Sequence, residues 1–400
     1  MIRFFFLLLP LLFLCSCAAP TTRRPGIPAV DSYDMREIRR ELRKFSYDEA
    51  TRRRQRLGQI AYNIRRSTGQ ELCDRRLLPD IGVDFMRINR LTVPKWRSSY
   101  DIYREEHEDA QTVYRRRTGE IWIEGVYKNS AAEKAGLKKG DRLVSVNGFA
   151  VPDEDNAFEQ IFKHLQQGGE TLPVEIVVER GGKIMKFSFR PDMLCPYNVS
   201  VDENAPEINA YANGYGIVMT ARMMDYIKDD TALAAVIAHE MAHNVLGHNA
   251  SSNDNALIGL LLGAAVDFSA GGDGSAMATG MYIGNNAYSK EFEMEADYVG
   301  YYLLARAGYD YKHAALMQKM LAALAPMDIY IYSDPESTHP SSSVRLALAR
   351  ETAKEIDLKL ALGDKLSELY PDFDRVNEYL RDKTDITKEK GLWQLPIRSS

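Results

Sequence analysis

Two histidines four residues apart, with a glutamate directly after the first, occur in the segment "AHEMAHNVLGH" at residues 238–248. The apolar run "TALAAVI" leads into this segment without proline or glycine, which predicts a buried helix. Positions four apart on a helix are separated by about 400°, so His239 and His243 project from one face and can hold one ion with their ring nitrogens. This H-E-x-x-H spacing is typical of zinc sites in which the glutamate, here Glu240, takes a proton from the attacking water. A helix with two hydrogen-bonded core histidines is the alternative that the short motif leaves open.

A third zinc ligand must come from another part of the chain. His248 lies about 140° from His243 around a continuous helix, so we exclude it as a ligand. The segment "SKEFEMEADYVGYYLLARAG" predicts a second helix that ends at Gly308 and carries Glu293 and Asp297 four residues apart on one face. A glutamate ligand, with a nearby acid that accepts the other N–H of a metal-bound histidine, completes a catalytic zinc site with one open position.

Two other glutamates compete for the role of third ligand. Glu291 is six residues before Asp297 and Glu295 only two, so neither shares the face of Asp297. Glu293 is therefore the predicted ligand, and Asp297 the predicted partner of a zinc-bound histidine. The two helices together predict one Zn²⁺ ion per chain as the cofactor.

The elements of a smaller unit lie upstream, between residues 119 and 191. "IWIEGVY" alternates as a strand does, "NSAAEKAGLKKGDRLVSVNG" predicts a short helix, a glycine turn and a strand, and "PVEIVVERGGKIMKFSFRP" predicts a hairpin. This order, and "AAEKAGLKKGDRLVSVNG" above all, resembles a bacterial PDZ domain. The resemblance implies a groove in which an extended peptide adds to a sheet edge. We expect it between the strand of Ile121 and Ile123 and the helix of Phe158 and Phe162.

The metal-binding segments resemble those of the gluzincin metallopeptidases of the HtpX and CAAX-prenyl-endopeptidase family, most closely its periplasmic BepA/LoiP-like members. Four segments carry the resemblance, in the family's order: "EINAYANGYGIVMTARMM", "AHEMAHNVLGH", "EFEMEAD" and "STHPSSSVRLALAR". It implies zinc on the same three ligands, Glu240 as general base and acid, and Asp297 as the acid behind a zinc-bound histidine. It also brings His339 and Arg345 near the metal as catalytic candidates. The strand predicted at "YGIVMT", residues 215–220, is expected to align an extended substrate by edge pairing.

His339 and Arg345 each have more than one interpretation. Pro340 and the serines after it place His339 on a loop. There it can donate to the oxyanion of the tetrahedral intermediate, occupy the fourth zinc position and block the enzyme, or serve only as a turn residue. Arg345, on the helix that follows, can bind an oxyanion or a carboxylate, or form a salt bridge to a buried acid.

The N-terminal segment "MIRFFFLLLPLLFLCSCAAP" has one positive residue followed by roughly a dozen apolar residues, too few to cross a bilayer. It has the anatomy of an export signal, and "LCSC" resembles the bacterial lipobox, which implies a lipidated Cys17 after removal of residues 1–16. An ordinary signal peptide and an N-terminal anchor helix are the alternatives. Residues 17–34 are polar and proline-rich, which predicts a flexible tether between lipid and domain.

Two cysteines remain in the predicted mature chain besides the lipidated one. In an exported chain, Cys73 and Cys195 favour one disulfide, with two separate buried thiols as the alternative. Closing so long a loop stabilises a folded chain by roughly 4–5 kcal/mol through loop-closure entropy. If the helices before residue 95 belong to the peptidase, the PDZ unit interrupts that domain and this disulfide joins the flanks of the insertion.

The composition is that of a globular chain of several domains. Its 400 residues are 45% hydrophobic, and a net charge of -5 with both signs mixed gives no electrostatic case for a nucleic-acid partner. The predicted fold is α+β, with a mostly helical zincin domain, a small edge-strand sheet and an inserted PDZ-like β-sandwich or barrel. The predicted order is a lipoprotein signal peptide at 1–16, a tether at 17–34, an N-terminal helical part of the peptidase at 35–110, the PDZ domain at 111–192, the catalytic domain at 193–352, and a C-terminal helical segment and tail at 353–400.

The sequence thus predicts a lipid-anchored zinc endopeptidase of the bacterial envelope that faces the periplasm, with the outer membrane favoured over the inner. Its expected partners are protein or peptide substrates, a peptide ligand of the PDZ domain, and the membrane that holds its lipid. Unfolded or misassembled envelope proteins are the expected substrates, an expectation that rests on the family resemblance. The alternative is a lipid-anchored PDZ binding or chaperone-like protein whose zinc site is latent or structural.

Overall fold

The computed structural model of the chain describes residues 32–87, 120–152, 156–167, 172–248, 250, 289–324 and 342–367. The predicted lipidation site Cys17 and the loop histidine His339 lie outside these residues. The described part combines helices with three sheets, which confirms the expected mixture of α and β structure. None of its helices is both long enough and apolar enough to cross a bilayer.

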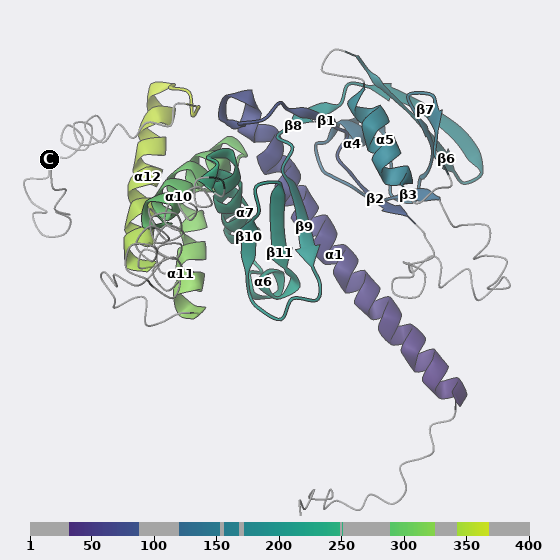
Figure 1. Cartoon of the computed structure of the whole chain (residues 1–400), viewed down its shortest axis with the longest axis horizontal. Helices are drawn as coiled ribbons and strands as arrows, with labels where there is room; N and C mark the ends of the chain where they lie inside the picture. The colour runs from purple at the N-terminus through teal and green to yellow at the C-terminus, as the bar shows by residue number, and fades with distance from the viewer. Residues whose placement is uncertain are drawn as a thin grey trace, which may run out of the picture.

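One long helix, α1 (Ser32–Leu72), runs between the two halves of the molecule (Figure 1). On one side, its residues Leu57 and Ile64 are buried in the core of the larger half. On the other side, the Gln55 side chain donates a hydrogen bond to the backbone oxygen of Glu124 in the smaller half, at 2.7 Å. The helix therefore holds both halves against a common support.

The smaller half, on the right of Figure 1, is a sheet accompanied by two short helices. Its elements are β2 (Val83–Arg87), β3 (Ile121–Val126), α4 (Ala131–Ala135), β4 (Arg142–Val146), β5 (Phe149–Ala150), α5 (Ala157–Gln166), β6 (Val174–Arg180) and β7 (Lys183–Phe189). The strand order is β2-β3-β4-β6-β7, with β5 paired to β4. β2 pairs with β3 in this sheet although it lies before residue 111, where the sequence predicts the start of the PDZ domain.

The strand expected to line the peptide groove, β3, is not a terminal strand of the sheet. β3 pairs with β4 on one side and with β2 on the other, and its residues Ile121 and Ile123 are fully buried. The prediction that β3 offers a free edge was therefore wrong, since β2 is the terminal strand of the sheet. The Phe85 ring of β2 meets the Phe162 ring of α5 edge-on at 6.4 Å between centroids, and Phe158 lies beside Phe162 at the same spacing.

The chain enters and leaves the PDZ sheet through adjacent segments. β1 (Leu78–Asp80) pairs antiparallel with β8 (Asp192–Leu194), directly before and after the strands of the sheet. Cys73 and Cys195 are joined by a disulfide across 122 residues, and both are buried. The two flanks of the PDZ unit are therefore linked by a short ladder and by a covalent bond.

The larger half contains a three-stranded sheet that lies beside its helices. Its strands are β9 (Asn198–Asp202), β10 (Ala210–Ala212) and β11 (Gly216–Thr220). β11 is the middle strand, parallel to β9 and antiparallel to β10. The sequence placed the substrate-aligning edge at residues 215–220, which was wrong because β11 is paired on both sides, with β9 and with β10. The terminal strand on the side of the metal site is β10.

The helices of the larger half pack around one central helix. They are α6 (Ala221–Tyr226), α7 (Asp230–Val245), α10 (Ser289–Arg306), the 3₁₀ turn η1 (His313–Ala315), α11 (Leu316–Leu324) and α12 (Ser342–Leu362). α7 is buried along most of its length, and α10 crosses it closely at Gly300. A Cβ atom at Gly300 would lie 3.2 Å from the backbone nitrogen of His239, so a larger residue would push the two helices apart. This close contact brings the first turns of α10 to the histidines of α7.

Candidate metal centre

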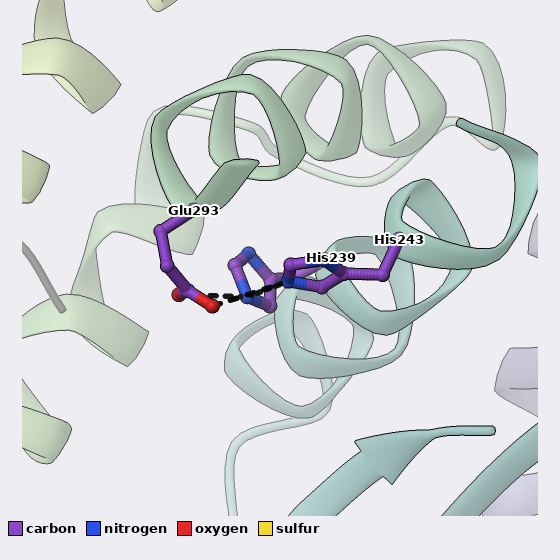
Figure 2. Close-up of side chains that lie close together, drawn as sticks. All are labelled: His239, His243 and Glu293. Carbon is purple, nitrogen blue, oxygen red and sulfur yellow. Dashed lines mark hydrogen bonds and ion pairs between the residues drawn. The ribbon is translucent and has the colours of Figure 1, made fainter. Parts of the chain in front are cut away.

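His239 and His243 of α7 and Glu293 of α10 point toward one another (Figure 2). The Nε2 atoms of the two histidines are 3.1 Å apart. One carboxylate oxygen of Glu293 lies 3.4 Å from His239 Nε2, and the other lies 3.3 Å from His243 Nε2. The structure thus brings together the three residues that the sequence proposed as metal ligands.

These separations fit a zinc ion. Bonds of about 2.0–2.1 Å in a tetrahedron place neighbouring ligand atoms about 3.3 Å apart. The two imidazole nitrogens, 3.1 Å apart, lie close to this value, and the Glu293 carboxylate approaches each nitrogen with a different oxygen, at 3.4 and 3.3 Å. Two neutral imidazoles and one carboxylate also form the donor set that zinc takes in hydrolytic sites with a fourth position for water. The geometry and the donor chemistry therefore agree.

Asp297, one helical turn after Glu293, holds the ring of His239. Its carboxylate lies 2.9 Å from His239 Nδ1, which leaves Nε2 free for a metal. Arg345 of α12 donates to both oxygens of Asp297 at 2.7 and 2.8 Å, and Gln318 of α11 donates at 3.1 Å. Burial alone would raise the pKa of Asp297, but the neighbouring guanidinium of Arg345 lowers it. Asp297 therefore stays ionised, and Arg345, which also lies 3.5 Å from Glu293, faces two acids.

The ring of His243 has a partner that the sequence reasoning missed. His248 is buried, its Nδ1 lies 2.9 Å from His243 Nδ1, and its Nε2 lies 3.2 Å from the carboxylate of Glu295. The ring of His248 stacks on Phe292 at 4.4 Å between centroids. A continuous helix would turn His248 away from His243, but Gly247 has a φ of 70° and turns the chain back toward the site. Each of the two candidate histidine ligands is thus oriented through its second ring nitrogen.

Replacing His248 by alanine is expected to weaken zinc binding by about 10–100-fold, because the ring of His243 would lose the partner that fixes its tautomer. Zinc affinity is measured by competition with a chromophoric chelator. His164→Ala, which removes a histidine from the PDZ unit, is the matched control and should leave the affinity unchanged. Equal zinc affinities of wild type and His248→Ala would show that His248 contributes packing and does not orient His243.

The pH dependence of zinc binding follows from His239. Burial alone lowers its pKa, but hydrogen bonds to Asp297 and Glu293 outweigh burial and raise the pKa to about 10. Zinc binds the neutral ring, so each ion bound near neutral pH displaces a proton from His239. Affinity is therefore expected to rise about tenfold per pH unit between about pH 6 and pH 8. An affinity independent of pH in the chelator competition would contradict this assignment.

Glu240 connects the metal site with the terminal strand β10. Its carboxylate accepts a hydrogen bond from the backbone nitrogen of Ala212 at 2.8 Å, and burial raises its pKa. The backbone groups of Asn209 and Asn213 bond to β11. Because bonding direction alternates along a strand, the backbone groups of Ala210 and Ala212 point away from β11. On this side the Ala212 N–H donates to Glu240 and the Ala210 N–H donates to the side chain of Asn209.

Two ligands from an H-E-x-x-H helix, a third from a second helix and a glutamate beside them define the site of a metallopeptidase. Residues 174–353 match the family model described as "Peptidase family M48", and residues 122–180 match that of the PDZ domain. The chain therefore combines an M48 metallopeptidase domain with a PDZ domain, which confirms the resemblance read from the sequence.

Two curated relatives illustrate the similarity. The chain is 31% identical to the mitochondrial metalloendopeptidase OMA1 of Schizosaccharomyces pombe over 207 residues, which cover 50% of this chain and 58% of the relative. It is 29% identical to the beta-barrel assembly-enhancing protease of Escherichia coli K12 over 167 residues, which cover 38% of this chain and 34% of the relative. The chain thus spans between about a third and somewhat more than half of these relatives. The crystal structure of the HtrA3 PDZ domain bound to a phage-derived ligand is 24% identical, with a TM-score of 0.20, and covers 30% of this chain and 88% of that chain.

Proposed function

We propose that this protein is a zinc-dependent endopeptidase that cleaves unfolded or misassembled proteins of the bacterial cell envelope. The observation that carries the proposal is the convergence of His239, His243 and Glu293, with Glu240 between them and a terminal strand. The activity is supported by the M48 match, and the envelope by the printed name of the Escherichia coli relative together with the predicted export signal. The substrate class rests on this analogy.

The chemistry is shared between the bound ion and the side chains of this chain. The two histidines and Glu293 would hold the zinc ion, which when bound would supply the Lewis acidity that polarises the scissile carbonyl and lowers the pKa of water. Glu240 takes a proton from the attacking water and returns it to the leaving amine, a role suited to a carboxylate whose pKa is raised. Arg345 acts by holding Asp297, and through it His239, in place.

The substrate is bound as an extended strand along β10. The substrate backbone replaces the Asn209 side chain at the Ala210 N–H and the Glu240 carboxylate at the Ala212 N–H. This backbone pairing selects peptide in an open conformation over folded protein. The contact between the Ala212 nitrogen and Glu240 supports this binding mode, because a peptide paired with β10 would have its scissile bond beside the general base. Because backbone groups carry most of this recognition, we expect broad side-chain specificity and cleavage within chains.

The PDZ unit binds an extended peptide at the edge of β2, beside the helix that carries Phe158 and Phe162. The terminal position of β2 and the packing of Phe85 against Phe162 support this site. We also infer that the PDZ unit is an insertion in the peptidase domain, in agreement with the β1–β8 ladder and with the disulfide between its flanks.

Attachment to the membrane rests on Cys17. Cys17→Ser is expected to move the protein from the membrane fraction to the soluble periplasmic fraction, because it removes the proposed lipidation site. The measurement is cell fractionation with detection of the protein, and Cys15→Ser serves as the control. A Cys17→Ser protein that stays in the membrane fraction would favour an N-terminal anchor helix instead.

The activity is tested with casein as an unfolded substrate for the purified chain without residues 1–16. We expect the protein to cleave casein. This cleavage should stop when a zinc chelator is added and return when zinc is added back. The rival function, a PDZ binding or chaperone-like protein with a latent or structural zinc, predicts no cleavage under any of these conditions. Cleavage that persists unchanged in the chelator would contradict a zinc mechanism.

A further inference from the structure

The turn between β10 and β11, residues 213–216, is held by the helix that carries the histidine ligands. Asn244 directly follows His243 on α7 and is 2% exposed. Its side chain accepts a hydrogen bond from the backbone nitrogen of Gly214 at 2.9 Å and donates one to the backbone oxygen of Gly216 at 3.0 Å. One amide side chain therefore satisfies a donor and an acceptor of the same turn.

A second side chain holds the same turn from outside. Arg75 donates to the backbone oxygen of Gly214 at 2.7 Å. Its guanidinium lies over the ring of Tyr197 at 4.8 Å and over the ring of Tyr215, in the turn itself, at 5.8 Å. These contacts combine a charge-assisted hydrogen bond with cation–π attraction. The turn is thus hydrogen-bonded to an asparagine on one side and to an arginine on the other.

The contacts of Arg75 and Asn244 with the turn lie close to the disulfide between Cys73 and Cys195. Arg75 follows Cys73 by two residues, Tyr197 follows Cys195 by two residues, and the two cysteines are bonded to each other. The Tyr197 hydroxyl donates to the carboxylate of Asp74 at 2.8 Å and also lies 3.3 Å from the backbone oxygen of Asn244. The disulfide therefore fixes the segment of Arg75 against a tyrosine that contacts the catalytic helix.

We propose that Asn244 and Arg75 are positioning residues that hold β10 beside Glu240, so that an extended substrate can pair with this strand. The inference rests on the proposed function and extends it to residues that touch neither zinc nor the reacting atoms. β10 is three residues long, so its own ladder fixes it weakly, and Ala212 stands only two residues before Gly214. Asn244 lies on α7 together with the candidate ligands His239 and His243. Its hydrogen bonds to the turn therefore fix the position of β10 relative to the metal site.

The proposal separates substrate binding from metal binding and from the chemical step. Loosening the turn lets β10 move, so the backbone groups that pair with the substrate are no longer held in place. The side-chain hydrogen bonds of both residues go to the turn, so the zinc ligands keep their own partners. The expected signature is a higher KM for long peptides at constant kcat and constant zinc content.

Hydrogen exchange tests whether Asn244 and Arg75 hold the turn, here called the clamp, and it does not require enzymatic activity. Arg75→Ala and Asn244→Ala are each expected to speed exchange of the amides of residues 210–216 by about tenfold, with exchange in α7 unchanged. Arg75→Lys, which keeps a donor but loses the planar group, should give an intermediate rate. Arg76→Ala, the same change at the exposed neighbouring residue, should match wild type. Unchanged exchange in Arg75→Ala, an exposed position where folding is not at risk, would overturn the proposal.

Kinetics then test what the clamp does for the substrate. A peptide of about ten residues is built around a mapped casein cleavage site, and a second peptide keeps only the residues next to the scissile bond. Both alanine variants should raise KM for the long peptide by about tenfold, leave kcat within about twofold, and change the short peptide little. Equal losses for both peptides, or a fall in zinc content, would overturn the positioning role. A wild-type protein that cleaves neither casein nor peptide would instead reject the proposed function, and the exchange result would still decide whether the clamp exists.

Discussion

Replacing Glu240 by glutamine is expected to lower kcat for peptide hydrolysis by about 10²–10⁴-fold, the contribution of a positioned general base. The amide has nearly the same size and can still accept the hydrogen bond that the carboxylate takes from Ala212. It cannot take a proton from water. Zinc content should remain one ion per chain, because Glu240 is not among the three residues whose ligand atoms cluster.

The measurement for Glu240→Gln combines kcat on a casein-derived peptide with zinc analysis of the same sample. Glu37→Gln, at an exposed position on α1, is the matched control and should behave as wild type. Full activity of Glu240→Gln with zinc still bound would remove Glu240 from the mechanism. Loss of zinc would show instead that the substitution disturbs the site, and Glu240→Asp would then test the base with a shorter carboxylate.

Removal of a metal ligand should have the largest effect on metal affinity. Glu293→Ala is expected to weaken zinc binding more than about 100-fold, beyond the loss caused by removing a hydrogen-bond partner of a ligand. Cleavage of casein at zinc concentrations that saturate wild type should disappear. The fold should persist, because Glu293 is partly exposed and Asp297 keeps its bonds to Arg345 and Gln318.

Zinc affinity of Glu293→Ala is measured by chelator competition, as for His248→Ala. Glu351→Ala on α12 removes a glutamate that pairs with Lys354, and it should leave both affinity and activity unchanged. Graded losses are expected, from none in this control, through about 10–100-fold in His248→Ala, to the largest in Glu293→Ala. A Glu293→Ala protein that keeps wild-type affinity would exclude this glutamate as the third ligand.

The residues around the metal site were largely predictable because they lie on two uninterrupted helices. A spacing of four residues determines a shared face by itself, so the sequence alone pairs His239 with His243, and Glu293 with Asp297. The crossing of α7 and α10 at Gly300 then brings the two faces together. That crossing depends on a glycine whose importance only the packing reveals.

Other features escaped prediction because they depend on turns and on strand order. Gly247 reverses the chain and returns His248 to the site, whereas helical periodicity placed that histidine elsewhere. β10 is too short to show a strand pattern, so the more apolar β11 was taken for the edge. β2 joins the PDZ sheet although it stands more than thirty residues before β3 in the chain. Pairing between distant segments leaves little trace in a single sequence.

Arg345 illustrates how a structure narrows a choice that the sequence leaves open. As a lone arginine near a metal site, it suited either an oxyanion or a buried acid. Its bidentate contact with Asp297 and its proximity to Glu293 favour the acid. We therefore assign it a positioning role, and the proposed mechanism relies on zinc to stabilise the oxyanion. His339 and Cys17 remain predictions from the sequence.

The central claim is that side chains of two helices bind one zinc ion and leave a position for water. Crystals grown with zinc and measured at the zinc absorption edge test it most directly. The account predicts one strong anomalous peak per chain, about 2.0–2.2 Å from Nε2 of His239, Nε2 of His243 and a carboxylate oxygen of Glu293. A map with no peak among these three residues, or with its zinc peak bound elsewhere, would contradict the account.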